Sequence, residues 1–192
     1  NNRVIIVGAT SGIGRALAML YANAGWQVAI TGRRKELVDS FVNDQKAKNP
    51  DSVIVSRCFD VRANDNISNI NELINQLGGL DMLIYNAGYG DVSDSLDWNI
   101  EKRTYETNVK GFIEIVHFAY NFFEHQGHGH VVATSSIASI RGNRHAPAYS
   151  ASKAFMSTYL EGLFMRSLKL KNRIYVTDIQ PGFVDTHPVE GT

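Results

Sequence analysis

The sequence predicts a three-layer, doubly wound α/β fold in which helices cover both faces of a parallel sheet. Short apolar runs alternate with longer segments of helical period along the chain. When single helices join consecutive strands, the connections are crossovers, which make neighbouring strands parallel. The runs are apolar throughout rather than alternating, as expected of strands that are buried on both faces.

The elements follow one another in regular alternation. The predicted strands are Val4–Val7, Val28–Thr31, Val53–Cys58, Met82–Tyr85, Val131–Thr134 and Ile174–Ile179. The predicted helices, with apolar residues three to four positions apart, are Ile13–Ala24, Leu37–Lys48, Asp65–Leu77, Ile100–Phe123 and Tyr149–Leu170. Residues 182–192 show no further strand or helix pattern.

Length and composition indicate one globular domain spanning residues 1–192, of which 44% are hydrophobic. Nineteen basic and nineteen acidic residues give no net charge, which argues against nucleic acid or an anionic membrane as the partner. No apolar stretch approaches the roughly 18 residues of a membrane span. Cys58 is the only cysteine, which excludes an internal disulfide and favours a reducing, cytoplasmic location. Its neighbours predict a buried thiol on the third strand.

A glycine-rich turn follows the first strand and opens the first helix. Its residues are Gly8, Thr10, Ser11, Gly12, Ile13 and Gly14. At the carboxyl end of a parallel strand, amides at a helix start can face a phosphate. We expect Gly8 to turn the chain, Gly12 to let a cofactor approach the backbone, and Gly14 to let the helix lie against the sheet. The spacing is neither GxGxxG nor a nucleoside triphosphate loop, so an ordinary glycine turn is the alternative.

The end of the second strand carries Gly32, Arg33 and Arg34, and no acid occurs between Gly25 and Lys35. An acid here would bind a free ribose 2′-hydroxyl, whereas an arginine can bind a 2′-phosphate. The sequence therefore predicts NADP rather than NAD. A solvated helix start is the alternative.

Six motifs occur in order: VGATSGIG (7–14), YNAG (85–88), NVKG (108–111), SS (135–136), YSASK (149–153) and PGFVDT (181–186). Together they resemble the short-chain dehydrogenase/reductase family, of its single-domain, NADP-preferring type. The resemblance covers essentially the whole chain and implies a Rossmann fold with strand order 3-2-1-4-5-6. It also implies a seventh strand, for which this sequence shows no candidate, so a C-terminal part is expected to be absent.

Two residues depart from the family pattern. Val7 replaces a threonine that ties its strand to the next, so another polar group is expected to make that contact. Tyr85 replaces the first asparagine of the usual NNAG. Both lie outside the expected chemistry.

Tyr149 and Lys153 are four residues apart, so on a helix they share one face. A nearby ammonium stabilises a phenolate, which makes the tyrosine a candidate general acid/base. The resemblance adds Ser136 as the residue that orients the substrate oxygen, with Ser135 as its rival. Asn108 and Gly111 are weak helix formers and predict a local distortion. By resemblance Asn108 would hold a water beside the lysine; the alternative is an asparagine that faces solvent.

The remaining cofactor contacts are implied by the resemblance alone. Asp60 and Val61 would meet the adenine, and Val184 and Thr186 the nicotinamide carboxamide. The other implied lining residues are Asn86, Ala87, Gly88, Tyr149, Lys153, Pro181 and Gly182.

These features predict an NADP-dependent oxidoreductase that transfers hydride between nicotinamide and a small carbonyl or alcohol substrate. A non-catalytic NADP-binding regulator is the alternative, and a sugar nucleotide epimerase, which shares YxxxK, usually needs a larger carboxyl-terminal lobe. His128 and His130 precede the fifth strand without clustered cysteine or carboxylate partners, so no metal is expected. By resemblance, the long helices from 100 and 149 imply a homodimer or homotetramer.

Overall fold

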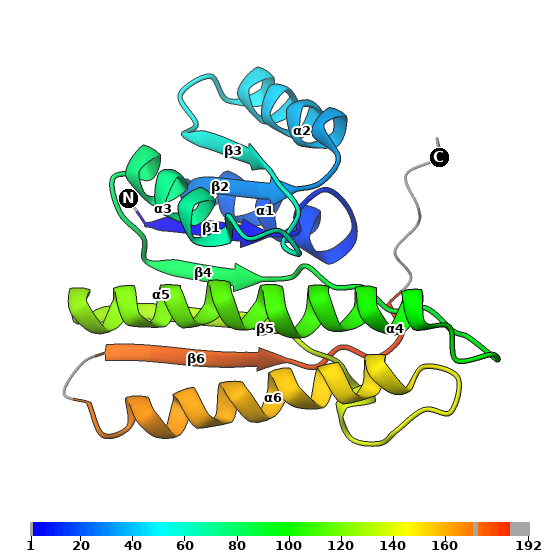
Figure 1. The fold of residues 1–192 in the computed structure, drawn as a ribbon. Helices are drawn as coiled ribbons and strands as arrows, with labels where there is room; N and C mark the ends of the chain where they lie inside the picture. The colour runs from blue at the N-terminus through cyan, green and yellow to red at the C-terminus, as the bar shows by residue number, and fades with distance from the viewer. Residues whose placement is uncertain (1, 171–172, 185–192) are drawn as a thin grey trace.

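The computed structural model describes residues 2–170 and 173–184, and these residues form a six-stranded parallel sheet (Figure 1). The strand order is β3-β2-β1-β4-β5-β6, which confirms the predicted doubly wound topology. The strands are β1 (Arg3–Val7), β2 (Gln27–Gly32), β3 (Ile54–Cys58), β4 (Met82–Tyr85), β5 (His128–Thr134) and β6 (Arg173–Ile179). The order reverses direction between β1 and β4, where open α/β sheets bind their ligands.

Helices pack on both faces of the sheet, giving three layers (Figure 1). The α-helices are α1 (Gly12–Asn23), α2 (Lys35–Lys48), α3 (Asn66–Leu77), α4 (Trp98–Tyr105), α5 (Phe112–Gln126) and α6 (Pro147–Ser167). A π-helical segment, η1 (Glu106–Gly111), joins α4 to α5, and a short 3₁₀ helix, η2 (Ile137–Ser139), follows β5.

Two hydrophobic cores lie on opposite faces, and β1 contributes to both. Val4 and Ile6 pack with residues of α1 and α2. Ile5 and Val7 pack with residues of α3, α5 and α6. Successive side chains of a strand point to opposite faces, so an uninterrupted apolar strand is the pattern that a double-sided core requires.

The predicted long helix over Ile100–Phe123 is interrupted by η1. Asn108 and Gly111 both lie within this segment, so the distortion expected from these two weak helix formers is present. A π turn bonds residues five apart and commonly occurs at functional sites.

Two expectations were wrong. Cys58 is exposed rather than buried, because it ends β3, which is an edge strand of the described sheet. His128 and His130 are part of β5 rather than preceding it, and His130 Nε2 lies 2.8 Å from Thr177 Oγ1 on β6. Burial of His130 lowers its pKa.

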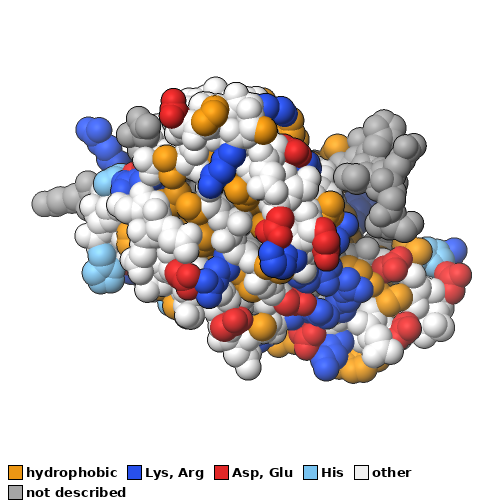
Figure 2. Space-filling view, turned by 90° about the horizontal axis from the view of Figure 1, so that it is seen from above, with side chains coloured by type: hydrophobic (Ala, Val, Ile, Leu, Met, Phe, Trp, Pro, Cys, Tyr) orange, Lys and Arg blue, Asp and Glu red, His pale blue; other side chains and the backbone are white. Residues whose placement is uncertain are grey.

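Among the described residues, none of the helices has the length and apolar character of a membrane span. In the same part of the chain, His, Cys, Asp and Glu side chains form no group of three or more suited to a metal ion. Basic and acidic side chains are interspersed over much of the face seen in Figure 2.

Candidate active site

A cleft of about 530 Å³ opens at the carboxyl ends of the strands, beside the point where the strand order reverses. Its lining comes from the ends of all six strands and the segments that follow them. The residues that line it are Gly8, Thr10, Ser11, Gly12, Ile13, Thr31, Gly32, Arg33, Arg34, Phe59, Asp60, Val61, Asn86, Ala87, Gly88, Tyr89, Thr107, Thr134, Ser136, Tyr149, Lys153, Pro181, Gly182 and Val184.

Nearly all the residues assigned to the cofactor from sequence therefore meet in one cleft. Gly14 does not line it. A Cβ at that position would lie 2.1 Å from the Gly8 carbonyl oxygen, so the absence of a side chain lets α1 pack against the turn. Thr186 lies outside the described residues.

The glycine turn leaves the start of α1 open to a ligand. Gly8 and Gly12 have φ angles of +84° and +54°, a region that glycine adopts without strain. The Ser11 side chain makes no capping hydrogen bond, and the first turn of α1 contains no acidic residue. Unpaired amides at a helix start attract anions, so the turn is suited to a phosphate group.

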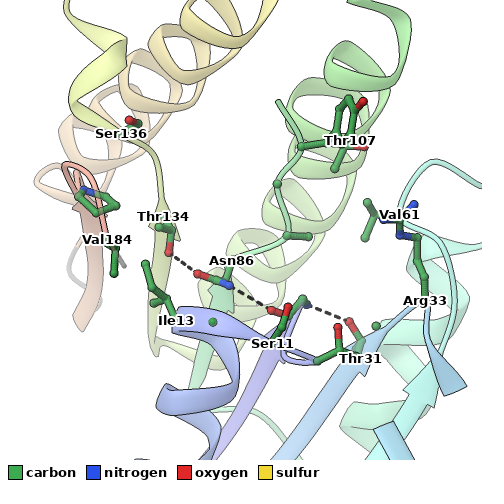
Figure 3. A pocket seen from close by; sticks show the side chains of 18 of the residues that line it. Ser11, Ile13, Thr31, Arg33, Val61, Asn86, Thr107, Thr134, Ser136 and Val184 are labelled. Atoms are coloured by element: carbon green, nitrogen blue, oxygen red, sulfur yellow. Dashed lines mark hydrogen bonds between the residues drawn. The ribbon is translucent and has the colours of Figure 1, made fainter. Parts of the chain in front are cut away.

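Asn86 connects three strands beneath the turn (Figure 3). Its Nδ2 donates to the Gly8 carbonyl oxygen at 3.0 Å, and its Oδ1 accepts from Thr134 Oγ1 at 2.9 Å. Its backbone amide donates to the carbonyl oxygen of Val7 at 2.9 Å. The Asn86 side chain is thus a polar link between the turn after β1 and the end of β5.

One end of the cleft is basic. Arg34 donates from Nη2 to Thr10 Oγ1 at 3.1 Å and to Ser11 Oγ at 2.9 Å, so its guanidinium is fixed beside the glycine turn. Arg33 also lines this end, near Val61, whereas Ser136 and Val184 lie at the other end (Figure 3). Two guanidinium groups at this end of the cleft favour an anionic group on the ligand.

Asp60 lies at the same end but is already paired. Both of its carboxylate oxygens accept from the Arg62 guanidinium at 2.6–3.0 Å. These hydrogen bonds hold the pKa of Asp60 below its usual value. A ligand amino group would therefore share an ionised carboxylate with Arg62, which the sequence did not suggest.

Tyr149 and Lys153 lie together on α6 at the other end of the cleft. Lys153 Nζ is 5.7 Å from the centre of the Tyr149 ring and donates to the Thr134 carbonyl oxygen at 2.9 Å. The lysine is 5% exposed, and burial lowers its pKa to about 8, while Asp178 acts in the opposite direction. At pH 7 the side chain is still mainly an ammonium, held next to the phenol by burial and one backbone carbonyl.

The two serines at 135 and 136 have different surroundings. Ser136 lines the cleft, and its Oγ accepts from the Ala138 amide at 3.1 Å at the start of η2. Ser135 instead donates to the carboxylate of Asp178 and does not line the cleft. Position therefore favours Ser136 as the serine that a substrate can reach.

Asn108 is fully buried behind the cleft, which excludes the solvent-facing alternative. Its Oδ1 accepts from the Tyr89 amide at 2.9 Å, and its Nδ2 donates to the Tyr89 carbonyl oxygen at 2.7 Å. Nδ2 also lies 2.9 Å from Ser152 Oγ on α6. The side chain thus links the segment after β4 to the helix that carries Tyr149.

Sequence reasoning missed several lining residues: Thr31, Gly32, Phe59, Thr107 and Thr134. Most of them are next in sequence to strand-end residues that the sequence did predict, and this neighbourhood could have identified them. Gly90 was also missed, although a Cβ there would lie 2.2 Å from Cδ2 of the Tyr149 ring. No local pattern marks that contact, because it joins distant parts of the chain.

Comparison with known proteins agrees with this geometry. The sequence matches the family model of the short chain dehydrogenases over residues 2–191. An uncharacterized oxidoreductase of Myxococcus xanthus is 35% identical over 186 residues, covering 94% of this chain and 71% of the relative. An uncharacterized oxidoreductase of Mycobacterium tuberculosis is 30% identical over 189 residues, covering 96% of this chain and 74% of the relative.

Solved structures share the fold. A putative short-chain alcohol dehydrogenase from Sinorhizobium meliloti superposes with a TM-score of 0.87 at 27% identity, covering 100% of this chain and 75% of that one. The chain therefore belongs to the short-chain dehydrogenase family and is an NAD(P)-dependent short-chain dehydrogenase/reductase.

Proposed function

We propose that this protein is an NADP-dependent oxidoreductase that interconverts a carbonyl and an alcohol, with Tyr149 as the general acid/base. The observation that carries the proposal is the buried Lys153 ammonium beside the Tyr149 ring, in the same cleft as the open glycine turn. In this proposal the described chain acts as one cofactor-binding and catalytic domain.

The residues of the cleft suit a dinucleotide that carries a 2′-phosphate. The amides at the start of α1 are available to the diphosphate, and Arg33 and Arg34 provide planar donors for the phosphate on the ribose. No acidic residue stands where a free 2′-hydroxyl would need one, between positions 25 and 35. Asp60 and Val61 would contact the adenine, and Val184 the nicotinamide.

Bound NADPH supplies the hydride, and the side chains of the chain handle the proton. Tyr149 donates its hydroxyl proton to the substrate oxygen in reduction and accepts it in oxidation. Lys153 stabilises the phenolate left behind, because its ammonium lies on the same side of the cleft. Ser136 hydrogen-bonds the substrate oxygen as charge develops on it. Asn108 holds the surrounding segments, and by resemblance a water beside the lysine.

We also propose that the protein is a homodimer or homotetramer and acts on a small molecule in the cytoplasm. Exposed apolar residues on α6, including Phe164 and Met165, support self-association. Cys58, an exposed thiol, supports a reducing compartment.

The decisive experiment is to follow NADPH absorbance with a panel of ketones, aldehydes and quinones, comparing wild type with Tyr149→Phe. Loss of the hydroxyl should reduce kcat by about 10² to 10⁴-fold, because general acid catalysis is lost. NADPH binding, measured by fluorescence titration, should be retained. NADH should be a poorer hydride donor than NADPH.

Tyr159→Phe is the matched control, because Tyr159 lies on the same helix but does not line the cleft. Its kcat should remain near that of wild type. A near-normal rate in Tyr149→Phe would refute the acid/base assignment. Binding of NADPH without oxidation by any substrate would favour the regulatory alternative.

A further inference from the structure

Tyr85, which replaces the first asparagine of the family's NNAG motif, makes a hydrogen bond to a residue that lines the cleft. Tyr85 ends β4, is fully buried, and its hydroxyl donates to the Thr107 carbonyl oxygen at 2.7 Å. Burial raises the pKa of Tyr85, so the hydroxyl stays protonated and remains a donor. The ring packs edge-on against Phe112, the first residue of α5, with centres 5.4 Å apart.

Thr107 belongs to the π turn η1, which is packed closely against the end of β4 and the segment after β3. A Cβ at Gly111 would lie 2.7 Å from the Val61 carbonyl oxygen and 3.1 Å from the Tyr85 hydroxyl. Glycine at this position therefore lets the turn approach β4 and the residues after β3. In this packing the Tyr85 hydroxyl is a hydrogen-bond donor from β4 to a carbonyl of the turn.

The residue after Thr107 is Asn108, whose side chain reaches in two directions. It bonds both backbone groups of Tyr89 and lies 2.9 Å from Ser152 Oγ. Ser152 Oγ in turn donates to the Tyr149 carbonyl oxygen at 2.8 Å. A continuous set of hydrogen bonds thus runs from the π turn to the first turn of α6.

We propose that Tyr85 is a positioning residue, whose hydroxyl holds the π turn so that Asn108 keeps Tyr89 and Tyr149 in the reactive arrangement. The proposal rests on the function proposed above, in which Tyr149 is the acid/base. Tyr85 does not line the cleft, so it acts through Asn108 and not by touching a substrate.

Tyr85→Phe tests this because it removes one oxygen and leaves the ring packing in place. We expect kcat to fall by about 10- to 100-fold, since small displacements of catalytic groups have effects of that size. KM for NADPH should change less than about twofold, because the glycine turn, Arg33 and Arg34, which are proposed to hold its phosphates, have no contact with the Tyr85 hydroxyl. By hydrogen–deuterium exchange, amides of residues 106–111 should exchange faster than in wild type.

Tyr120→Phe is the matched control. Tyr120 is 2% exposed on α5, and its hydroxyl donates to the Leu163 carbonyl oxygen at 3.3 Å, away from the cleft. Like Tyr85→Phe, it removes one hydroxyl that bonds a backbone carbonyl, here in a partly buried hydrogen bond, so its melting temperature should fall while kcat and exchange at 106–111 stay as in wild type. Equal loss of kcat in both variants would show a merely structural effect and overturn the proposal.

A double-mutant comparison tests the route through Asn108. Adding Tyr85→Phe to Asn108→Ala should lower kcat by less than about twofold, because coupled residues are not additive. If Tyr85→Phe lowers kcat as much in the Asn108→Ala variant as it does in wild type, Tyr85 does not act through Asn108. If wild type oxidises no NADPH, the proposed function fails, and exchange at 106–111 still decides whether Tyr85 holds the turn.

Discussion

Lys153 combines burial with a position beside the proposed acid/base. Its ammonium has one backbone partner, the Thr134 carbonyl oxygen, and Asp178 is the acidic group that raises its pKa against the effect of burial. The folded protein therefore holds this proton less tightly than the unfolded chain does, in which a lysine has a pKa of about 10.4. The net result is a pKa of about 8.

This difference makes stability depend on pH in a defined direction. Between pH 8 and 10.4 the unfolded chain binds more protons than the folded protein, so the free energy of unfolding rises with pH. Between pH 7.5 and 9.5 the contribution of Lys153 is about 2 kcal/mol, from the value of ~1.4 kcal/mol per pKa unit. Urea denaturation of the cofactor-free protein at the two pH values measures it.

Lys153→Met provides the comparison, because it keeps an unbranched side chain of similar length without the titrating group. Other groups titrate alike in both proteins. The increase in the free energy of unfolding between pH 7.5 and 9.5 should therefore be about 2 kcal/mol smaller in the variant than in wild type. An equal pH dependence in the two proteins would show that the lysine is not destabilised by burial.

At the scale of elements, the segment after β4 lies against the start of α6. Gly90 has no side chain where a Cβ would come within 2.2 Å of the Tyr149 ring. In Gly90→Ala the alanine methyl group would overlap the Tyr149 ring. The ring is expected to move, because a side chain can rotate more easily than the backbone can shift. We expect kcat to fall by about 10-fold or more through displacement of the hydroxyl, with little change in melting temperature.

Gly142→Ala is the control for this variant, since nothing lies within 4 Å of a Cβ at that position. It should keep the kcat of wild type. If Gly90→Ala is equally active, the ring of Tyr149 is not held by this contact.

The elements also show what sequence can predict. The strands were predictable because burial on both faces imposes uninterrupted apolar runs. A distortion of the long helix was predictable because Asn108 and Gly111 disfavour an α-helix, although its π geometry was not. The glycine turn was found because a helix start at the carboxyl end of a parallel strand suits a phosphate, whereas the lining residues after the later strands came from the family resemblance. The Tyr85 and Gly90 contacts were not predictable, because each joins residues far apart in sequence whose spacing carries no periodic signal.

For the whole molecule, the distribution of apolar residues on α6 differs from that of a helix with one buried face. Met156 and Leu160 pack into the core, while Phe164 and Met165 are 46% and 55% exposed, and Leu168, directly after the helix, is 63% exposed. A helix that is apolar on both sides is usually covered on both sides. A second copy of the chain can provide that cover through a symmetric contact, as in most homodimers.

Phe164→Glu tests this, because it places a charge in the proposed contact at a side chain that is exposed in the single chain. Light scattering after size exclusion should give wild type at least twice the 21.3 kDa chain mass and the variant a mass near 21.3 kDa. Leu20→Glu is the control: Leu20 is 64% exposed on α1, on the opposite face of the sheet, and should not alter the mass. A monomeric wild type, or a variant that stays associated, would show that α6 is not the contact. Dissociation caused equally by Leu20→Glu would place the contact elsewhere, because α1 and α6 cover different faces of the sheet.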